Sequence, residues 1–395
     1  MIQIAIMGLG TIGTGVAEVI DKNAAQIQRK LGEPLKVKSI LVRHFKEGPY
    51  RPFMTDDFSV IEQDPEIRVV VETIGGTGAA YDYTKRALCA GKHVVTANKQ
   101  LVAEHGCELL ELAEAHHVHY LFEASVGGGI PILHPLTQCL AANRITEIYG
   151  ILNGTTNYIL TRMVRGGASF QEALKEAQKK GYAEADPTAD VEGIDAGRKT
   201  CILADLAFGQ NVEPDAVPME GISNLSLKDV QVAEQAGYQI KLLGRTLQLP
   251  DGTRTAYVAP HLISNENPIA HVQDVFNAVT VCGNATDEVL FYGKGAGAMP
   301  TASACISDVM EAIQTEPCRP ELRWSKDPTG FFHPDALKSR YYFRIAGSPA
   351  DAEAAFGHVE VLSENNGTAF LTDPISGTQA KQYHEGLKAR FRVLP

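Results

Sequence analysis

The hydrophobic pattern of the first third of the chain alternates between short apolar runs and longer segments with helical spacing. The short runs, typical of buried strands, are residues 2–7, 36–42, 69–72, 93–99 and 118–122. Helical spacing follows the first run and recurs over 79–90 and 106–115. Strands that alternate with helices build a parallel sheet, and ligands bind at the carboxyl ends of such strands. This pattern therefore predicts an α/β domain with a ligand site along one sheet edge.

The middle of the chain has a different pattern. Helices are predicted over 132–143, 170–179, 191–208 and 304–313, with a strand at 145–151. Strand-like runs follow one another without intervening helices at 238–247, 253–262, 272–282 and 288–292. Such a succession favours an open, mainly antiparallel sheet, whose exposed edge commonly pairs with that of a second copy. We therefore predict an α+β domain and a homodimer.

The end of the chain is read as a linker followed by a small domain. Residues 315–339 are rich in proline, charge and aromatic side chains, which indicates a linker. Residues 340–395 then show the order β-α-β-β-α-β in short segments. The predicted division is 1–130 (completed by 298–314), 131–297, 315–339 and 340–395.

Composition and charge exclude several classes of function. The 395 residues carry a formal charge of −11, which argues against nucleic acid as a main partner. No apolar run approaches the roughly 20 residues that a membrane helix needs, so no membrane association is expected. The seven cysteines are scattered, with no Cys-x-x-Cys pair. That usage is typical of reduced thiols in a cytoplasmic enzyme.

A glycine motif directly after the first strand predicts a dinucleotide site. Gly8, Gly10 and Gly13 form Gly-x-Gly-x-x-Gly between a strand and a helix, with Thr11 and Ile12 as the intervening pair. The first glycine permits a tight turn, the second allows the pyrophosphate to approach, and the third allows helix to pack on strand. The fold is therefore predicted to be a Rossmann-type parallel sheet, joined to the α+β domain and the small tail.

The second predicted strand bears on the choice of cofactor. It ends in Arg43 and His44, where an acid would bind the free 2′-hydroxyl of NAD. A cation there favours NADP, although NAD stays possible and Arg43 could equally be a plain surface residue. Thr73 and Lys99 follow the next two strands and are expected at the same sheet edge.

Residues 181–204 combine several carboxylates with one lysine. Asp195 and Lys199 share one helical face, and Glu184 and Asp190 precede that helix. A carboxylate can bind a substrate ammonium while a lysine donates or accepts a proton. The alternative is a solvated helix end with an ordinary ion pair, which contributes little to stability.

Three further stretches carry a family resemblance together with this one. The stretch reads Gly181-Tyr-Ala-Glu-Ala-Asp-Pro-Thr-Ala-Asp-Val-Glu-Gly-Ile-Asp-Ala-Gly-Arg-Lys199, and it resembles the substrate motif of homoserine dehydrogenases. The segments Thr96-Ala-Asn-Lys99, Asn153-Gly-Thr-Thr-Asn-Tyr-Ile-Leu160 and Gly293-Lys-Gly-Ala-Gly297 are similar to motifs of the same family. The resemblance covers roughly residues 1–313. It implies interconversion of L-aspartate 4-semialdehyde and L-homoserine, on the route to threonine and methionine.

The resemblance implies roles for individual residues. Lys199 is the expected proton donor, with Lys99 as helper or rival. Substrate contacts are expected from Glu184, Asp190, Asp195, Thr155 and Tyr182, and cofactor contacts from Lys99, Gly181 and Gly297. For Thr155, simple turn formation and helix capping remain an equal alternative.

The loop after the fifth strand, Glu123-Ala-Ser-Val-Gly-Gly-Gly-Ile-Pro131, cannot form a regular ladder. From the residues alone it is a hinge between domains. The resemblance implies a structural sodium ion held by main-chain carbonyls of Glu123, Val126, Gly128 and Ile130.

The tail resembles a shortened ACT domain, an amino-acid-sensing module. Its first turn is Ala346-Gly-Ser-Pro-Ala350 and departs from that module's Asp-x-Pro-Gly-x-Leu pattern. Threonine sensing and a purely structural role both stay open. Two rival functions also stay open, a silent NADP-binding regulator and a dehydrogenase for a related semialdehyde.

Overall fold

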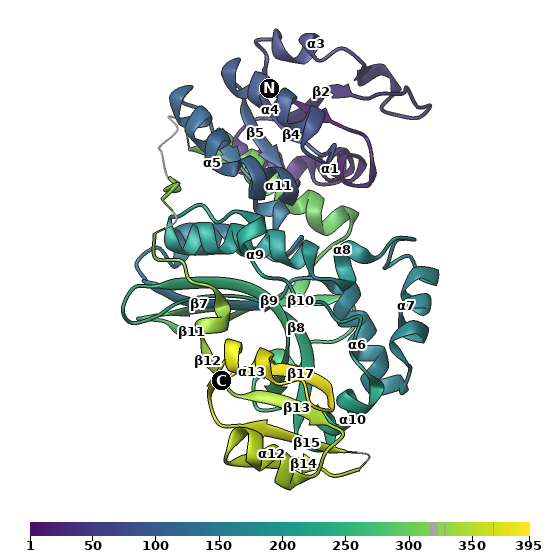
Figure 1. Cartoon of the computed structure of the whole chain (residues 1–395). Helices are drawn as coiled ribbons and strands as arrows, with labels where there is room; N and C mark the ends of the chain where they lie inside the picture. Colours follow the sequence, from purple (N-terminus) through teal and green to yellow (C-terminus); the bar gives the residue numbers. More distant parts are fainter. Residues whose placement is uncertain (316–322, 328, 366) are drawn as a thin grey trace. The chain divides into compact units, whose positions relative to one another are not determined.

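The computed structural model describes residues 1–315, 323–327, 329–365 and 367–395. The chain divides into two compact units, and each is described by itself. The first unit comprises residues 1–142, 201–214 and 293–328, and the second comprises 143–200, 215–292 and 329–395. Figure 1 shows the elements of both units in sequence colours. Part of the predicted linker, at 316–322 and 328, lies outside the described residues.

A six-stranded parallel sheet forms the centre of the first unit, as the alternating pattern predicted. Its strand order is β3-β2-β1-β4-β5-β6. The strands are β1 (Ile2–Met7), β2 (Leu35–Leu41), β3 (Met54–Thr55), β4 (Ile67–Glu72), β5 (His93–Thr96) and β6 (Tyr120–Leu121). Because β1 lies between β2 and β4, the glycine loop that follows β1 emerges at the middle of the sheet.

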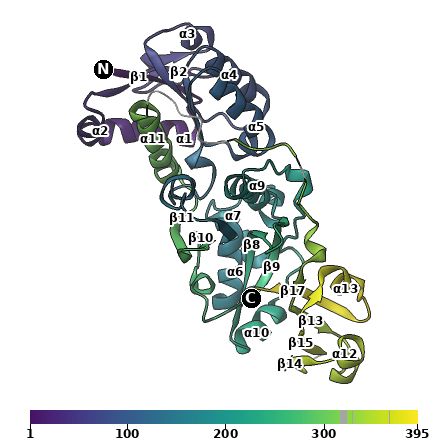
Figure 2. The same cartoon turned by 90° about the vertical axis from the view of Figure 1, so that its left-hand side faces the viewer.

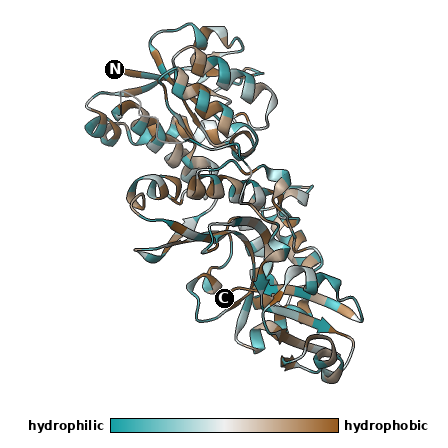
Figure 3. Cartoon of the chain, turned by 60° about the vertical axis from the view of Figure 1, so that its left-hand side comes forward, coloured by the Kyte–Doolittle hydropathy of each residue, from teal (hydrophilic) through white to brown (hydrophobic). Residues whose placement is uncertain are grey.

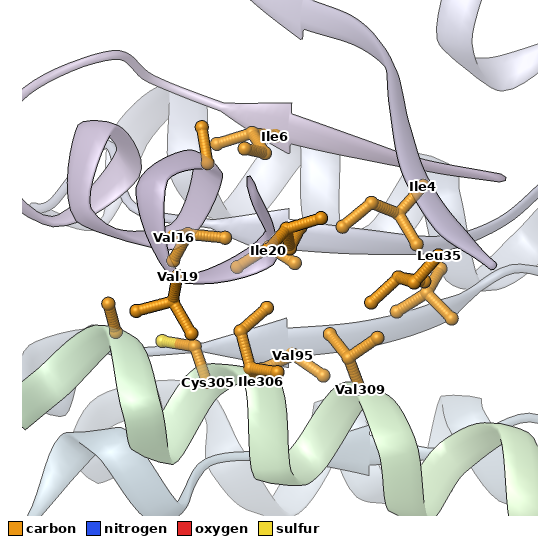
Figure 4. Packing of buried hydrophobic residues seen from close by; sticks show 14 of the residues in the cluster. Ile4, Ile6, Val16, Val19, Ile20, Leu35, Val95, Cys305, Ile306 and Val309 are labelled. Atoms are coloured by element: carbon orange, nitrogen blue, oxygen red, sulfur yellow. The ribbon is translucent and has the colours of Figure 1, made fainter. Parts of the chain in front are cut away.

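The helices of this unit pack through apolar faces. They are α1 (Thr11–Lys22), α2 (Ala24–Leu31), α3 (Ser59–Glu62), α4 (Gly78–Cys89), α5 (Lys99–Ala115) and α11 (Ala298–Gln314). A Cβ on Gly15 of α1 would lie 2.8 Å from the Ala298 carbonyl oxygen, so α1 and α11 approach very closely. Figure 4 shows the side chains that meet between these two helices: Val16, Val19, Ile20, Cys305, Ile306 and Val309.

The described part of the predicted linker contributes to the core of the first unit. Trp324 is buried, and its ring lies 5.8 Å from that of Phe122 in an edge-on contact. A Cβ on Gly106 would come within 2.6 Å of the Trp324 ring, so α5 accepts the indole only because glycine stands there. This segment is therefore a packed part of the unit and not only a connection.

A nine-stranded sheet organises the second unit. Its strand order is β11-β10-β7-β8-β9-β17-β13-β15-β14. Strands β10, β7, β8 and β9 pair antiparallel, as expected from the run of strands without helices. The first five strands in chain order are β7 (Ile145–Ile151), β8 (Tyr238–Gln248), β9 (Arg254–Ser264), β10 (Phe276–Gly283) and β11 (Asp287–Lys294).

Helices α6 (Gly154–Gly166), α7 (Phe170–Lys179), α8 (Thr188–Val191) and α10 (Leu227–Gln235) belong to this unit, with the part of α9 (Ile194–Phe208) that precedes Cys201. In place of the helix predicted over 132–143, the first unit has only a short π-helical segment, Pro135–Cys139. Figure 3 shows brown, hydrophobic colouring along many of the strands and teal at many loops and helix surfaces.

The tail has the predicted order of elements. These are β13 (Tyr341–Ile345), α12 (Pro349–Phe356), β14 (Val359–Ser363), β15 (Thr368–Thr372), α13 (Gly377–Gln382) and β17 (Leu387–Val393), with β12 (Lys338–Ser339) and β16 (Ile375–Ser376) as a small ribbon. Strand β17 pairs in parallel with β9, so the large sheet continues into the tail through β17, β13, β15 and β14, while β12 and β16 form a separate two-stranded sheet. Figure 2 shows α12 and α13 beside these strands.

One buried ion pair ties the tail strand β13 to helix α10. Asp229 is fully buried and accepts hydrogen bonds from Arg344 Nε at 2.6 Å and from the Tyr342 hydroxyl at 2.9 Å. The neighbours Tyr341 and Phe343 belong to the apolar cluster with Ala352 and Ala380 of the tail helices. Alternation along β13 thus assigns one face to the tail core and the other to α10.

Replacing Asp229 by alanine tests this tie. Asp229→Ala leaves the Arg344 guanidinium half-buried without its carboxylate, and we expect the unfolding free energy to fall by about 3–5 kcal/mol. The control is Arg340→Ala, which removes the more exposed pair of Arg340 and Glu360 and should cost less than about 1 kcal/mol. Urea unfolding followed by circular dichroism measures both, and equal losses would contradict the prediction.

Candidate active site

The strand register brings the predicted cofactor residues to one edge of the parallel sheet. Met7 of β1 pairs with Leu41 of β2 and with Glu72 of β4, and Glu72 pairs in turn with Thr96 of β5. The loops that follow these strands therefore begin at one level. A cavity of about 550 Å³ lies there, lined by Gly8, Leu9, Gly10, Leu41, Val42, Arg43, His44, Lys46, Asp56, Thr73, Ile74, Ala79 and Tyr83.

The three glycines of the loop meet different steric demands. Gly8 has a φ of +98°, which side chains rarely adopt. A Cβ on Gly13 would lie 2.0 Å from the Gly8 carbonyl oxygen, which leaves no room for any side chain. A Cβ on Gly10 would meet nothing within 4 Å, and no side chain caps α1. Gly10 and the first turn of α1 thus present open backbone, suited to an anionic pyrophosphate.

Basic residues line the same cavity. Arg43 and His44 follow β2, as the sequence indicated, and Lys46 lies with them. The Lys46 ammonium donates to the Leu9 carbonyl oxygen at 3.3 Å, which directs it toward the glycine loop. The sequence analysis did not identify Lys46. This residue lies in an irregular loop, where neither hydrophobic periodicity nor a motif indicates which way a side chain points.

Glu72 and Thr73 hold the edge together. The Glu72 carboxylate is fully buried and accepts from the Ile74 amide at 2.6 Å and from the Thr96 hydroxyl at 2.5 Å. Burial raises the pKa of Glu72, although these hydrogen bonds oppose the shift. The Thr73 hydroxyl donates to the Met7 carbonyl oxygen at 3.0 Å, so this residue supports the glycine loop as well as lining the cavity.

Lys99 occupies the first position of α5. The sequence placed it at the end of a strand, whereas β5 already ends at Thr96. Asn98 caps the helix by accepting from the Leu101 amide at 3.2 Å and donates to the Gly76 carbonyl oxygen at 2.6 Å. Lys99 therefore stands at the same sheet edge as Thr73, on a helix start that its neighbour fixes.

In the second unit, the predicted lysine and two of its acids form one network. The Lys199 ammonium donates to Asp195 Oδ2 and to the Leu152 carbonyl oxygen, both at 2.7 Å. Asn153 Nδ2 donates to Asp190 Oδ1 at 2.7 Å and to Asp195 Oδ2 at 2.9 Å. Asp195 and Lys199 are only 6% and 8% exposed. The pair is buried, which rules out the solvated helix end considered from the sequence.

Asp190 is the outer acid of this network. Burial raises its pKa, while hydrogen bonds from Asn153 and Thr155 partly offset the shift. Asn153 also caps α6 by accepting from the Thr156 amide at 2.9 Å. Asn153 therefore bridges the two carboxylates and also caps the start of α6. The sequence alone did not show that this residue has both roles.

Of the other predicted substrate residues, Thr155 joins the network through Asp190, while Tyr182 and Glu184 lie around it. The Thr155 hydroxyl donates to the Tyr182 carbonyl oxygen at 2.7 Å, which joins α6 to the loop after α7. The Tyr182 ring is 44% exposed and meets the Tyr158 ring edge-on at 5.0 Å. Glu184 is exposed, and Gly181 has a φ of +75° that allows the loop to turn after α7.

The loop expected to bind sodium is tightly built within the first unit. The Glu123 carboxylate accepts from the main-chain amides of Ile132, Leu133 and His134, and its main-chain carbonyl oxygen accepts from the Val126 amide at 3.4 Å. Within the described residues, the carbonyl oxygens of Val126, Gly128 and Ile130 accept no main-chain hydrogen bond.

Close packing holds this loop in place. A Cβ on Gly128 would lie 2.5 Å from the Gly295 carbonyl oxygen, so the loop packs tightly on the segment that precedes α11. Gly297 caps α11 with a φ of +125°.

No helix in the described part of the chain is long and apolar enough to span a membrane.

Comparison with known proteins agrees with these features. A family model described as homoserine dehydrogenase, NAD binding domain, matches residues 8–123, and one described as homoserine dehydrogenase matches 131–310. The homoserine dehydrogenase of Neisseria gonorrhoeae is 45% identical over 373 residues, covering 91% of this chain and 85% of that protein. The chain belongs to the homoserine dehydrogenase family. The resemblance inferred from its motifs is thereby confirmed, and its activity is the NAD(P)-dependent interconversion of L-aspartate 4-semialdehyde and L-homoserine.

Solved homoserine dehydrogenases share the fold. The enzyme from Thiobacillus denitrificans superposes with a TM-score of 0.91 at 36% identity, covering 100% of this chain and 98% of that one. A hyperthermophilic archaeal homoserine dehydrogenase in complex with NADPH has a TM-score of 0.68 at 26% identity, covering 80% and 99%. The Bacillus subtilis enzyme is 43% identical over 319 residues, or 79% of this chain and 73% of that protein.

Two glycine substitutions separate folding from cofactor binding. Gly13→Ala forces a Cβ against the Gly8 carbonyl oxygen, and we expect it to lower the unfolding free energy by about 1–3 kcal/mol. Gly10→Ala meets no protein atom and should leave stability nearly unchanged. It should weaken NADPH binding about tenfold, a change of about 1.4 kcal/mol. Urea unfolding and NADPH fluorescence titration measure the two effects, and equal destabilisation by both substitutions would refute this assignment.

Proposed function

We propose that Lys199 donates the proton that completes reduction of the aldehyde to the alcohol. The observation that carries the proposal is the buried network of Lys199, Asp195 and Asn153. The nicotinamide of the bound cofactor supplies the hydride. The carbonyl oxygen of the substrate then becomes an alkoxide, and a positioned ammonium can protonate it. Asp195 and the Leu152 carbonyl oxygen hold the lysine in place and stabilise its charge.

Asp190 and Asn153 are proposed to bind the amino-acid end of the substrate. Asp190 is half-buried, and a substrate ammonium beside it would offset the cost of its burial. Glu184 is exposed on the same loop and is proposed to bind the ammonium with it, supported by its place in the family motif. Thr155, Tyr182 and Gly181 are proposed to shape the loop around the substrate and the cofactor. Lys99 is proposed as a second proton-transfer or binding group.

Substitution of Lys199 tests the proposal. Lys199→Met removes the ammonium while keeping much of the side-chain volume, and we expect kcat with aspartate semialdehyde and NADPH to fall by about 100- to 10,000-fold. Lys175→Met, which replaces an exposed lysine on α7, is the control and should keep normal turnover. Loss of NADPH absorbance measures the rate, and circular dichroism confirms folding. Undiminished turnover in Lys199→Met would assign the proton to Lys99 or to water.

NADP is proposed as the preferred cofactor, with NAD as a weaker one. Three basic side chains, Arg43, His44 and Lys46, line the cavity beyond β2, and charge-assisted hydrogen bonds to the 2′-phosphate would favour the phosphorylated cofactor. Thr11, Ile12 and Gly13 in the first turn of α1 are proposed to bind the pyrophosphate, and Gly297 is proposed to contact the nucleotide.

Arg43→Ser tests this preference. Loss of one charge-assisted bond should reduce the ratio of kcat/KM for NADPH over NADH by about tenfold or more. Arg51→Ser is the matched control, because Arg51 is exposed, stacks on Phe45 and does not line the cavity. If the ratio of kcat/KM for NADPH over NADH stays unchanged in Arg43→Ser, this arginine does not bind the 2′-phosphate.

A structural sodium ion is proposed at the loop of Glu123, Val126, Gly128 and Ile130. Support comes from the carbonyl oxygens of the last three, which accept no main-chain hydrogen bond within the described chain. Hard monovalent cations prefer such oxygens. A sodium titration of the unfolding temperature measures this.

A homodimer in the cytoplasm is proposed for the whole protein. Strand β11 lies at one end of the large sheet and exposes Leu290 and Tyr292, which supports pairing with a second copy. Scattered free cysteines support a reducing compartment. The tail is proposed to have a structural role, because its strands continue the sheet of the second unit; threonine sensing is the alternative. Sedimentation equilibrium with and without threonine distinguishes these assignments.

A further inference from the structure

A second cluster of ionisable side chains lies in the first unit, outside the site described above. It consists of His134, Asp308 and Glu311, and one ligand atom from each side chain lies within 4.8 Å of the others. Asp308 and Glu311 are three residues apart on α11, so they face the same direction. His134 follows the glycine loop and comes from a distant part of the sequence.

Asp308 is the buried member of this cluster. It is 1% exposed, and its Oδ2 accepts from the Glu123 amide at 2.9 Å. Its Oδ1 is also buried and has no hydrogen-bond partner in the described part of the chain. An unpaired buried carboxylate oxygen is costly, and a cation beside it removes that cost.

His134 and Glu311 complete the donor set. The imidazole Nε2 contacts the Glu311 carboxylate. The main-chain amide of His134 donates to Glu123 Oε2 at 2.7 Å, which fixes the backbone that carries the ring. Both side chains line a cavity of about 430 Å³, together with Lys30, Gln138, Ser307 and Thr315. An ion from solvent therefore has a path to the cluster.

We propose that His134, Asp308 and Glu311 bind a divalent transition-metal ion, with Zn²⁺ as the best fit. One imidazole nitrogen and two carboxylate oxygens suit zinc, and solvent in the cavity would occupy the fourth position. Ligand atoms around tetrahedral zinc are roughly 3.3 Å apart, so the observed cluster closes on an ion with small side-chain rotations. The donors differ in kind from the carbonyl oxygens proposed for sodium.

Occupancy would link α11 to the segment between β6 and the π-helical turn. Asp308 already holds the Glu123 amide, and Glu123 holds the amides that lead to His134. An ion that joins Asp308 to His134 would close this chain of contacts into a ring. Binding to the folded state alone then stabilises the first unit in proportion to the logarithm of ion concentration. This proposal does not depend on the role of Lys199.

The test is calorimetric titration of the metal-stripped full-length protein with ZnCl₂, in a buffer that contains NaCl so that a sodium site stays filled. One zinc per chain is expected. His134→Ala should raise the Kd by at least about 100-fold, since loss of a ligand costs no less than loss of the residues that support one. Asp308→Asn and Glu311→Gln should weaken binding similarly. Co²⁺ absorption in the wild-type protein reports the coordination geometry independently of activity.

Two matched controls separate this site from adventitious binding. Cys139→Ser removes an exposed thiol five residues beyond His134, and His116→Ala removes an exposed imidazole on the same unit. Neither should change the affinity. The proposal is overturned if the wild-type protein binds no zinc at millimolar concentration, or if zinc binds equally well to His134→Ala. Loss of binding in Cys139→Ser alone would likewise overturn it. His134 is partly exposed, so its removal should leave the fold intact.

Discussion

A charge removed from water must be paired or hydrogen-bonded, and this constraint determines the geometry of the candidate site. Asp195 and Lys199 lie on one helical face, but burial makes their pairing obligatory. Each then needs a further partner, which Asn153 and the Leu152 carbonyl oxygen provide. Both come from the junction between β7 and α6, so the pair also fixes where that helix begins. A lysine held in this way is preorganised, because its position is set before substrate binds.

The same constraint shapes the loops of the first unit. Glu72 accepts from the main chain after its own strand and from Thr96 on the next strand, and Glu123 accepts from three successive amides. Each buried carboxylate thereby fixes an irregular segment that no regular hydrogen-bond ladder could hold. Asp308 departs from this rule, because only one of its oxygens is satisfied. That departure is the physical reason for placing a cation beside it.

Much of the fold follows from local sequence signals. The strand, glycine loop and helix at Ile2–Lys22 were predicted because steric demands at Gly8 and Gly13 act over a few residues. The tail elements were predicted in order, yet their union with the large sheet was not, because the pairing of β17 with β9 joins residues far apart in sequence. The helix predicted over 132–143 is reduced to the segment Pro135–Cys139, and Glu123, which accepts from the amides that precede this segment, comes from a loop that helical periodicity does not take into account. Lys99 was assigned to a strand end because hydrophobic periodicity does not reveal that Asn98 caps a helix at this point.

The site shows the same limit at the level of single residues. Glu184 is a fixed position of the family motif, yet it is exposed in this structure, whereas Asn153, from a separate motif, bridges the half-buried Asp190 and the buried Asp195. A sequence motif identifies residues that lie near the substrate in a family. It does not distinguish a residue that contacts the ligand from one that supports the protein structure. That distinction depends on burial and hydrogen-bond partners, which arise only when β7, α6 and α9 meet. The sequence was sufficient to infer the family and the reaction. The separate roles of the acids could be distinguished only from the folded structure.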